Sequence, residues 1–105
     1  MVALYVDGRV NLDASLEDVE TAIHSLDGSQ CTLVVVELAS GKTITIGGGP
    51  SKVVAELSEN DTHRWCVVDP PARICIEKEA ALKAARTFVS ENGARSRHLE
   101  WSVET

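Results

Sequence analysis

The feature that most constrains the fold is a β-hairpin pattern in the middle of the sequence. Residues 31–39 are dominated by β-branched side chains, including the consecutive Val34, Val35 and Val36, which favour a strand. Ser40-Gly41 is a turn signal, and residues 42–46 then alternate as a partner strand. Because the valines are consecutive, we expect the first of these strands to be covered on both faces. The centre of the chain is therefore predicted to be antiparallel sheet.

Two amphipathic helices are predicted on either side of this centre. The first, over residues 15–27, starts with Ser15 as N-cap and Asp18 three residues later, and stops at Gly28. The second starts near Glu77 and ends at Gly93. Their apolar stripes are Leu16, Val19, Ile23 and Leu26 in the first and Ala81, Leu82, Ala85, Phe88 and Val89 in the second.

Shorter strand patterns complete the chain. Residues 2–6 alternate up to the turn signal Asp7-Gly8, and the other strand patterns cover residues 53–57, 63–69 and 99–103. Residues 9–12 and 73–76 are weaker candidates. The length of 105 residues suits one domain over residues 1–105. We predict an α+β fold: a mostly antiparallel sheet of about five to six strands with two helices packed on it, and Phe88 and Trp101 in the core.

Composition and charge narrow the classes of partner. The net charge is −6, from 16 acidic and 10 basic residues, which argues against direct nucleic-acid binding. An acidic surface suits a basic protein partner, and it is equally explained by the need of a small domain to stay in solution. The sequence has no apolar run long enough to span a bilayer and no signal-peptide pattern at its start, so no membrane association is expected. Three widely spaced cysteines argue against a disulfide framework and favour a reducing, cytoplasmic location.

The residue patterns favour no catalytic, metal or cofactor site. Gly47-Gly48-Gly49-Pro50 lacks the spacing and the following helix of a phosphate-binding loop, so we interpret it as a β-turn. The cysteines and histidines lack metal-ligand spacing. His63 and Cys66, three apart in a predicted strand, should point to opposite faces and cannot form a catalytic pair.

The C-terminal third carries a resemblance to a known family. Residues 79–88 form an Ala/Leu-rich helix with a late Phe88, and Asn92-Gly93-Ala-Arg95 and Leu99-Glu-Trp101 follow. This segment resembles the closing segment of a family of small bacterial immunity proteins from polymorphic and contact-dependent toxin systems. Ser96 departs from that pattern, since proline is common there. The resemblance implies a non-catalytic antitoxin that binds one cognate toxin, notably a deaminase acting on DNA or other nucleotides, and blocks its active site or substrate groove.

A toxin-binding surface is predicted where carboxylates surround one large aromatic side chain. Trp65 is the candidate anchor, although sheet packing remains an open alternative for it. The predicted toxin-binding residues are Glu56, Glu59, Asp61, Trp65 and Asp69. A competing surface is the helix face with Glu17, Asp18 and Glu20. Two other functions stay open: a small ligand-binding or enzymatic domain with a pocket beneath the turn at residues 47–50, and a generic protein-interaction subunit.

Overall fold

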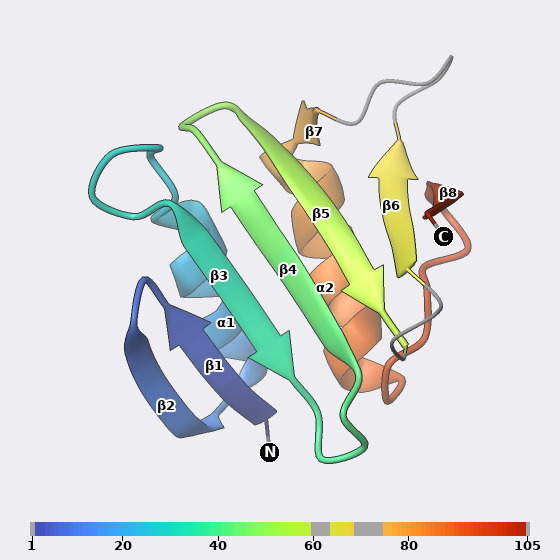
Figure 1. The fold of residues 1–105 in the computed structure, drawn as a ribbon, viewed down its shortest axis with the longest axis horizontal. Coiled ribbons are helices and arrows are strands. Elements are labelled where there is room, and N and C mark those ends of the chain that lie inside the picture. Colours follow the sequence, from blue (N-terminus) through green and yellow to red (C-terminus); the bar gives the residue numbers. More distant parts are fainter. Residues whose placement is uncertain (1, 60–63, 69–74, 105) are drawn as a thin grey trace.

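The described part of the chain forms one antiparallel sheet with two helices on the same face (Figure 1). A computed structural model describes residues 2–59, 64–68 and 75–104. The helices are α1 (Leu16–His24) and α2 (Lys78–Ser90). The strands are β1 (Val2–Val6), β2 (Arg9–Ala14), β3 (Leu33–Glu37), β4 (Thr43–Gly48), β5 (Lys52–Ser58), β6 (Arg64–Val68), β7 (Ile76–Glu77) and β8 (Glu100–Glu104).

The strands follow the order β2-β1-β3-β4-β5-β6-β8, and β7 pairs with β5. The predicted α+β class is confirmed, with eight strands in the described residues instead of about five to six. The two segments with weak strand patterns both contribute paired strands, because each lies beside the unpaired edge of another strand. The β2 strand returns along β1, and β7 shares one edge of β5 with β6.

Helix α1 starts as predicted but ends earlier than residue 27. The N–H of Asp18 donates to Ser15 Oγ (3.2 Å), and the N–H of Ser15 donates to Asp18 Oδ2 (2.9 Å), which completes a capping box. The helix ends at His24 because the Asp27 carboxylate accepts the N–H groups of the loop that follows. A side chain that bonds nearby N–H groups offers the backbone an alternative to further helix.

Helix α2 ends where the glycine signal predicts. The N–H of Gly93 donates to the carbonyl of Phe88 (2.7 Å), with Gly93 at φ +93°, a conformation that suits glycine. Phe88 is fully buried, as predicted. Arg86 reaches across to Glu20 (Nε to Oε1, 3.2 Å), so an ion pair joins the two helices beside their apolar contact. Both helices therefore lie side by side on one face of the sheet (Figure 1).

The one-sided arrangement contradicts the prediction that the first central strand is covered on both faces, and the edge position of β8 leaves Trp101 packed against the core but only partly buried. Val34 and Val36 are fully buried beneath the helices, but Val35 is only partly buried, on the face that neither helix covers. The last strand, β8, lies at an edge of the sheet, so Trp101 is only partly buried and Val103 is 47% exposed. The Trp101 indole N–H donates to the carbonyl of Ser96 (3.0 Å).

The glycine run before β5 forms a tight turn, as predicted. The N–H of Gly49 donates to the carbonyl of Lys52 (3.0 Å), and Gly48 has φ +140°. A Cβ atom on Gly48 would lie 2.8 Å from the carbonyl oxygen of Lys52, so a larger residue does not fit. A strand follows this turn directly, instead of the helix that a phosphate-binding loop requires.

Candidate functional site

The face of the sheet opposite α1 and α2, here called the outer face, is a broad surface that neither helix covers. Strand register defines a central row across it, in which each residue is the direct neighbour of the next: Val10, Tyr5, Val35, Thr45, Glu56, Cys66 and Ser102. The adjacent row contains Leu33, Gly47 and Val54. Because side chains alternate along a strand, these residues share one face.

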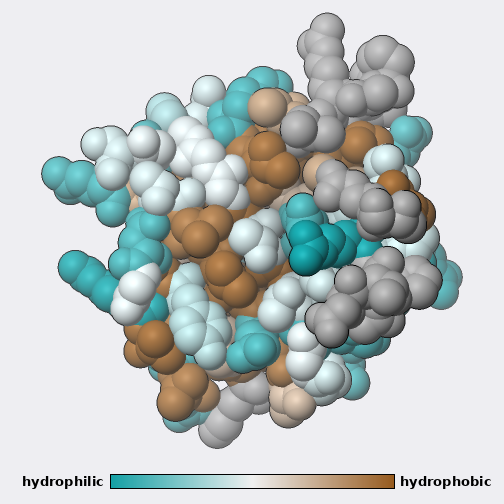
Figure 2. Space-filling view, viewed as in Figure 1, coloured by the Kyte–Doolittle hydropathy of each residue, from teal (hydrophilic) through white to brown (hydrophobic). Residues whose placement is uncertain are grey.

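Three apolar side chains and one threonine gather in the middle of this face. We define the outer-face patch as Leu33, Val35, Thr45 and Val54. Gly47 lies between two of these residues without a side chain of its own, and a Cβ atom there would lie 3.4 Å from Leu33 Cδ1. Figure 2 shows hydrophobic surface over β3 and the start of β5. Leu33 is exposed and the other three are partly exposed, so the patch is available for contact with another molecule.

Charged side chains border the outer-face patch. Glu37 accepts a hydrogen bond from the Tyr5 hydroxyl (3.2 Å), and this bond with the carboxylate charge raises the pKa of the Tyr5 phenol. Glu56 lies 3.9 Å from the Arg64 guanidinium. At the start of β5, Lys52 pairs with Glu77 at 2.6 Å. The patch therefore has a border of carboxylates, some of which pair with basic residues.

Trp65 lies on the opposite face from Glu56. It is the direct neighbour of the fully buried Leu57, whereas Glu56 is paired with Cys66. The Arg95 guanidinium stacks on the Trp65 ring, 3.5 Å from its centroid, and Arg95 Nε lies 3.7 Å from Glu59 Oε1. The Trp65 indole Nε1 is buried and has no hydrogen-bond partner among the described residues. Cation and ring attract each other in this geometry, so part of the ring is already covered in the free protein.

The structure thus brings only part of the predicted toxin-binding set together. Glu59 and Trp65 lie close to each other and are joined by Arg95. Glu56 belongs to the outer face. Asp61 and Asp69 lie outside the described residues. Sequence reasoning missed the role of Arg95, because Arg95 contacts Trp65 from a loop some thirty positions further along the chain.

The competing acidic helix face is used within the fold. Asp18 belongs to the capping box of α1, and Glu20 pairs with Arg86 of α2. Of these three carboxylates, Glu17 has neither contact and lies exposed in the first turn of α1. These bonds account for two of the three carboxylates, so the helix face is the weaker candidate surface.

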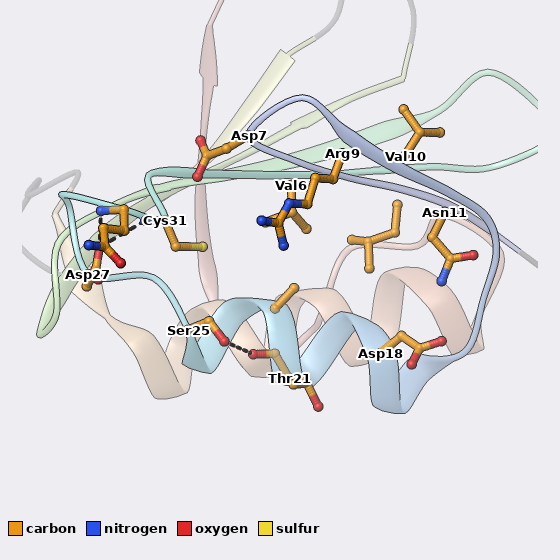
Figure 3. A pocket seen from close by; sticks show the side chains of 13 residues that line it. Val6, Asp7, Arg9, Val10, Asn11, Asp18, Thr21, Ser25, Asp27 and Cys31 are labelled. Carbon is orange, nitrogen blue, oxygen red and sulfur yellow. Dashed lines mark hydrogen bonds between the residues drawn. The ribbon is translucent and has the colours of Figure 1, made fainter.

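A cavity of about 720 Å³ lies between α1 and the β1–β2 hairpin (Figure 3). It is not beneath the turn at residues 47–50, where the ligand-binding alternative would place it; none of those residues lines it. Asp7, Arg9, Asp18, Asp27 and Cys31 contribute to its lining, and the Arg9 side chain extends into it between the hairpin and α1 (Figure 3). The cavity therefore has mixed charge.

The chemistry of this cavity does not favour a nucleophile. Burial and the nearby Asp7 and Asp27 carboxylates raise the pKa of the Cys31 thiol, which keeps it protonated at neutral pH. The pKa of Asp7 is lowered because its carboxylate accepts both the hydroxyl and the N–H of Thr32 (2.7 Å each). Asp7 is therefore a charged hydrogen-bond acceptor that fixes the start of β3, and not a proton donor.

Comparisons with protein families, with curated proteins and with solved structures found no match to this chain. None of the described helices is long and apolar enough to cross a membrane. Within residues 2–59, 64–68 and 75–104, no group of three or more His, Cys, Asp and Glu side chains is placed to hold a metal ion.

Proposed function

We propose that this chain is a cytoplasmic immunity protein that binds and neutralises a cognate toxin, and that the toxin is a deaminase acting on nucleic acid. The observation that carries the proposal is the outer-face patch: an apolar centre with a carboxylate border on a sheet face that neither helix covers. Protein interfaces combine an apolar centre with a polar border in this way. The resemblance of residues 79–101 to immunity proteins supplies the class of partner.

Charge supports the same class of partner. A toxin that acts on nucleic acid needs a basic substrate groove to bind phosphates. This chain has a net charge of −6, and Glu37 and Glu56 lie beside the outer-face patch. Opposite charges accelerate association of two proteins and favour the correct orientation. Inhibition by occupying the groove requires no catalysis and no cofactor.

The proposal predicts that a neighbouring gene encodes a deaminase-like toxin domain, and that domain is the partner used in the test. Purified toxin should lose its deaminase activity on DNA when about one equivalent of this chain is added. Val35→Lys and Val54→Lys place a charge in the outer-face patch and should weaken binding by about 30-fold or more, because desolvated interface centres dominate affinity. Ser90→Lys, an exposed position at the end of α2, adds the same charge on the helical side and should bind like the wild type.

A second pair of variants tests the surface predicted around Trp65. Trp65→Phe keeps an aromatic ring beneath Arg95, and Glu59→Gln removes the carboxylate that faces Arg95. If these two variants lose toxin binding while Val35→Lys and Val54→Lys retain it, the interface lies at Trp65 and not on the outer face. If the wild-type chain neither binds nor inhibits the toxin, the proposed function is wrong. Circular dichroism checks that each variant is folded.

A further inference from the structure

The β2 strand lies at an edge of the sheet, and it is unusually exposed. It pairs with β1 on one side, and no described strand pairs with its other side. Five of its six residues are exposed. Val10 (56%) and Leu12 (72%) are the most exposed large hydrophobic side chains of the described residues. An exposed apolar edge strand is a surface on which another strand can pair.

The β1–β2 turn determines which backbone groups face this free edge. Asp7 and Gly8, at φ 45° and 89°, form a two-residue hairpin turn, so the flanking Val6 and Arg9 form a hydrogen-bonded pair. Hydrogen-bonded and non-hydrogen-bonded pairs alternate along an antiparallel ladder. Val10 therefore directs its N–H and C=O to the free edge, and Leu12 follows by alternation.

The backbone N–H of Asp13, the residue after Leu12, already has a hydrogen-bond partner. The N–H of Asp13 donates to the Asn11 side chain (3.0 Å), and an extra residue lies between Asn11 and Ala14 relative to β1. This bulge limits regular pairing at the free edge to residues 9–13. The backbone groups available there are those of Val10 and Leu12.

We propose that two copies of this chain associate through β2, antiparallel about a two-fold axis at Asn11. In this register Val10 lies opposite the partner's Leu12, so the free backbone groups of each strand meet those of the other. Arg9 then lies opposite the partner's Asp13. A two-fold interface repeats each contact, which gives two such apolar pairs and two such ion pairs.

Charge complementarity favours a second copy of the chain as the partner strand, and it favours the register with the two-fold axis at Asn11. Neither Arg9 nor Asp13 forms an ion pair within the described part of the chain. A register centred on Val10 would place Arg9 opposite Asn11, and one centred on Leu12 would place Asp13 opposite Asn11, so neither would pair the charges. Directly opposite residues in an antiparallel pair have Cβ atoms about 4.5–5.5 Å apart, close enough for such pairing.

The interface is small and the dimer is weak. Five paired residues on each strand bury less than the area of about 1,000 Å² that marks a stable complex, so we expect a dissociation constant on the order of 10–100 µM. The association goes beyond the proposed function, because it needs only the chain itself and uses an edge of the sheet instead of the outer-face patch.

The test is sedimentation equilibrium of the full chain from about 5 to 500 µM, a range that brackets the expected constant. Arg9→Asp and Asp13→Arg each place like charges opposite one another and should weaken dimerisation about tenfold. The double variant Arg9→Asp/Asp13→Arg exchanges the two charges and should restore it. Arg97→Asp, a charge reversal at an exposed loop position, is the matched control and should dimerise like the wild type.

Amide hydrogen exchange gives an independent readout. With rising concentration, exchange at Val10 and Leu12 should slow, whereas exchange at Asn11, already bonded to β1, should not change. A monomer over the whole concentration range overturns the proposal, and so does a double variant that stays as weak as the single ones. If the chain stays monomeric and β2 is protected only when a toxin is added, the edge accepts a strand of the toxin and not a second copy.

Discussion

At the scale of single residues, Lys78 shows how one side chain links distant parts of the fold. Its ammonium donates to the carbonyls of His24 (3.0 Å), the last residue of α1, and of Leu26, two residues later. These carbonyls lack partners within the helix, and hydrogen bonds to a charged donor stabilise them. Lys78→Met should lower the free energy of unfolding by about 1 kcal/mol in urea melts, whereas Lys83→Met, at an exposed position of α2, should not change it. Equal melts for both variants would contradict the role of Lys78.

The two aromatic residues assigned to the core should differ in their contribution to stability. Phe88 is fully buried, so Phe88→Ala should cost about 3–5 kcal/mol. Trp101 is partly buried at an edge strand and bonds Ser96, so Trp101→Ala should cost less than Phe88→Ala. Urea melts measure both values. If either variant melts like the wild type but no longer binds the toxin, that residue belongs to the binding surface and not to the core.

At the scale of elements, two carboxylates fix the loop between α1 and β3. Asp27 Oδ1 accepts the N–H groups of Ser29, Gln30 and Cys31, and these bonds lower the pKa of Asp27. Asp7 has a lowered pKa through its bonds to Thr32. A pKa lower in the folded than in the unfolded state stabilises the fold above the ordinary carboxyl pKa of about 4, and this stability is lost as the pH falls through the folded value. The difference in urea midpoint between the wild type and Asp27→Ala should therefore be largest at neutral pH.

The same comparison at acid pH completes this test. The gap between Asp27→Ala and the wild type should narrow as the pH falls below about 4, because the wild-type carboxylate becomes protonated and stops accepting hydrogen bonds. Ser90→Ala is the control, since it changes an exposed position of α2 without removing a carboxyl group, and its gap from the wild type should stay constant with pH. A gap for Asp27→Ala that widens in acid would contradict the assigned role.

Elements whose signals are local could be predicted from the sequence. Ser15 and Asp18 define the start of α1 within four residues, and Gly93 defines the end of α2. The end of α1 was predicted at the more familiar glycine signal, Gly28, whereas the bonds from Asp27 to the following loop end the helix at His24, and Lys78 adds a contact from 52 positions away. The prediction that β3 is covered on both faces was wrong because it also depends on distant parts of the chain. Three consecutive valines indicate a strand, but Val35 is left uncovered because α1 and α2 both pack on the other face of the sheet.

At the scale of the whole molecule, the candidate site depends on which face each strand presents. Glu56 and Trp65 lie nine positions apart and were grouped by their proximity in sequence, yet the β5–β6 register directs them to opposite faces. The sequence does not identify Leu33, Val35 and Val54 as surface residues, because apolar residues in strands are usually assigned to the core. They form the outer-face patch only because both described helices lie on the other side. Register and layer order, which are non-local, therefore decide the site.

The uneven charge of the whole molecule gives the last prediction, which rests on the proposed function. Residues 1–72 hold eleven acidic and four basic residues, net −7, whereas residues 73–105 hold five and six, net +1. If the outer face meets a basic toxin groove, Glu37→Gln/Glu56→Gln should slow association several-fold at low salt and reduce its salt dependence. The dissociation rate should change by less than about twofold, because steering acts mainly on encounter.

The control for this prediction removes equal charge from the helical side. Glu79→Gln/Glu91→Gln changes two exposed carboxylates at the ends of α2 and should leave the association rate closer to that of the wild type. Surface binding kinetics at about 50 and 500 mM salt separate the two effects, because screening shortens the reach of charge from about 14 to about 4 Å. If both double variants slow association equally, the total charge attracts the toxin and the outer face has no special part in its encounter. A larger loss of association rate for Glu37→Gln/Glu56→Gln would show that the carboxylates on the outer face attract the toxin during its encounter.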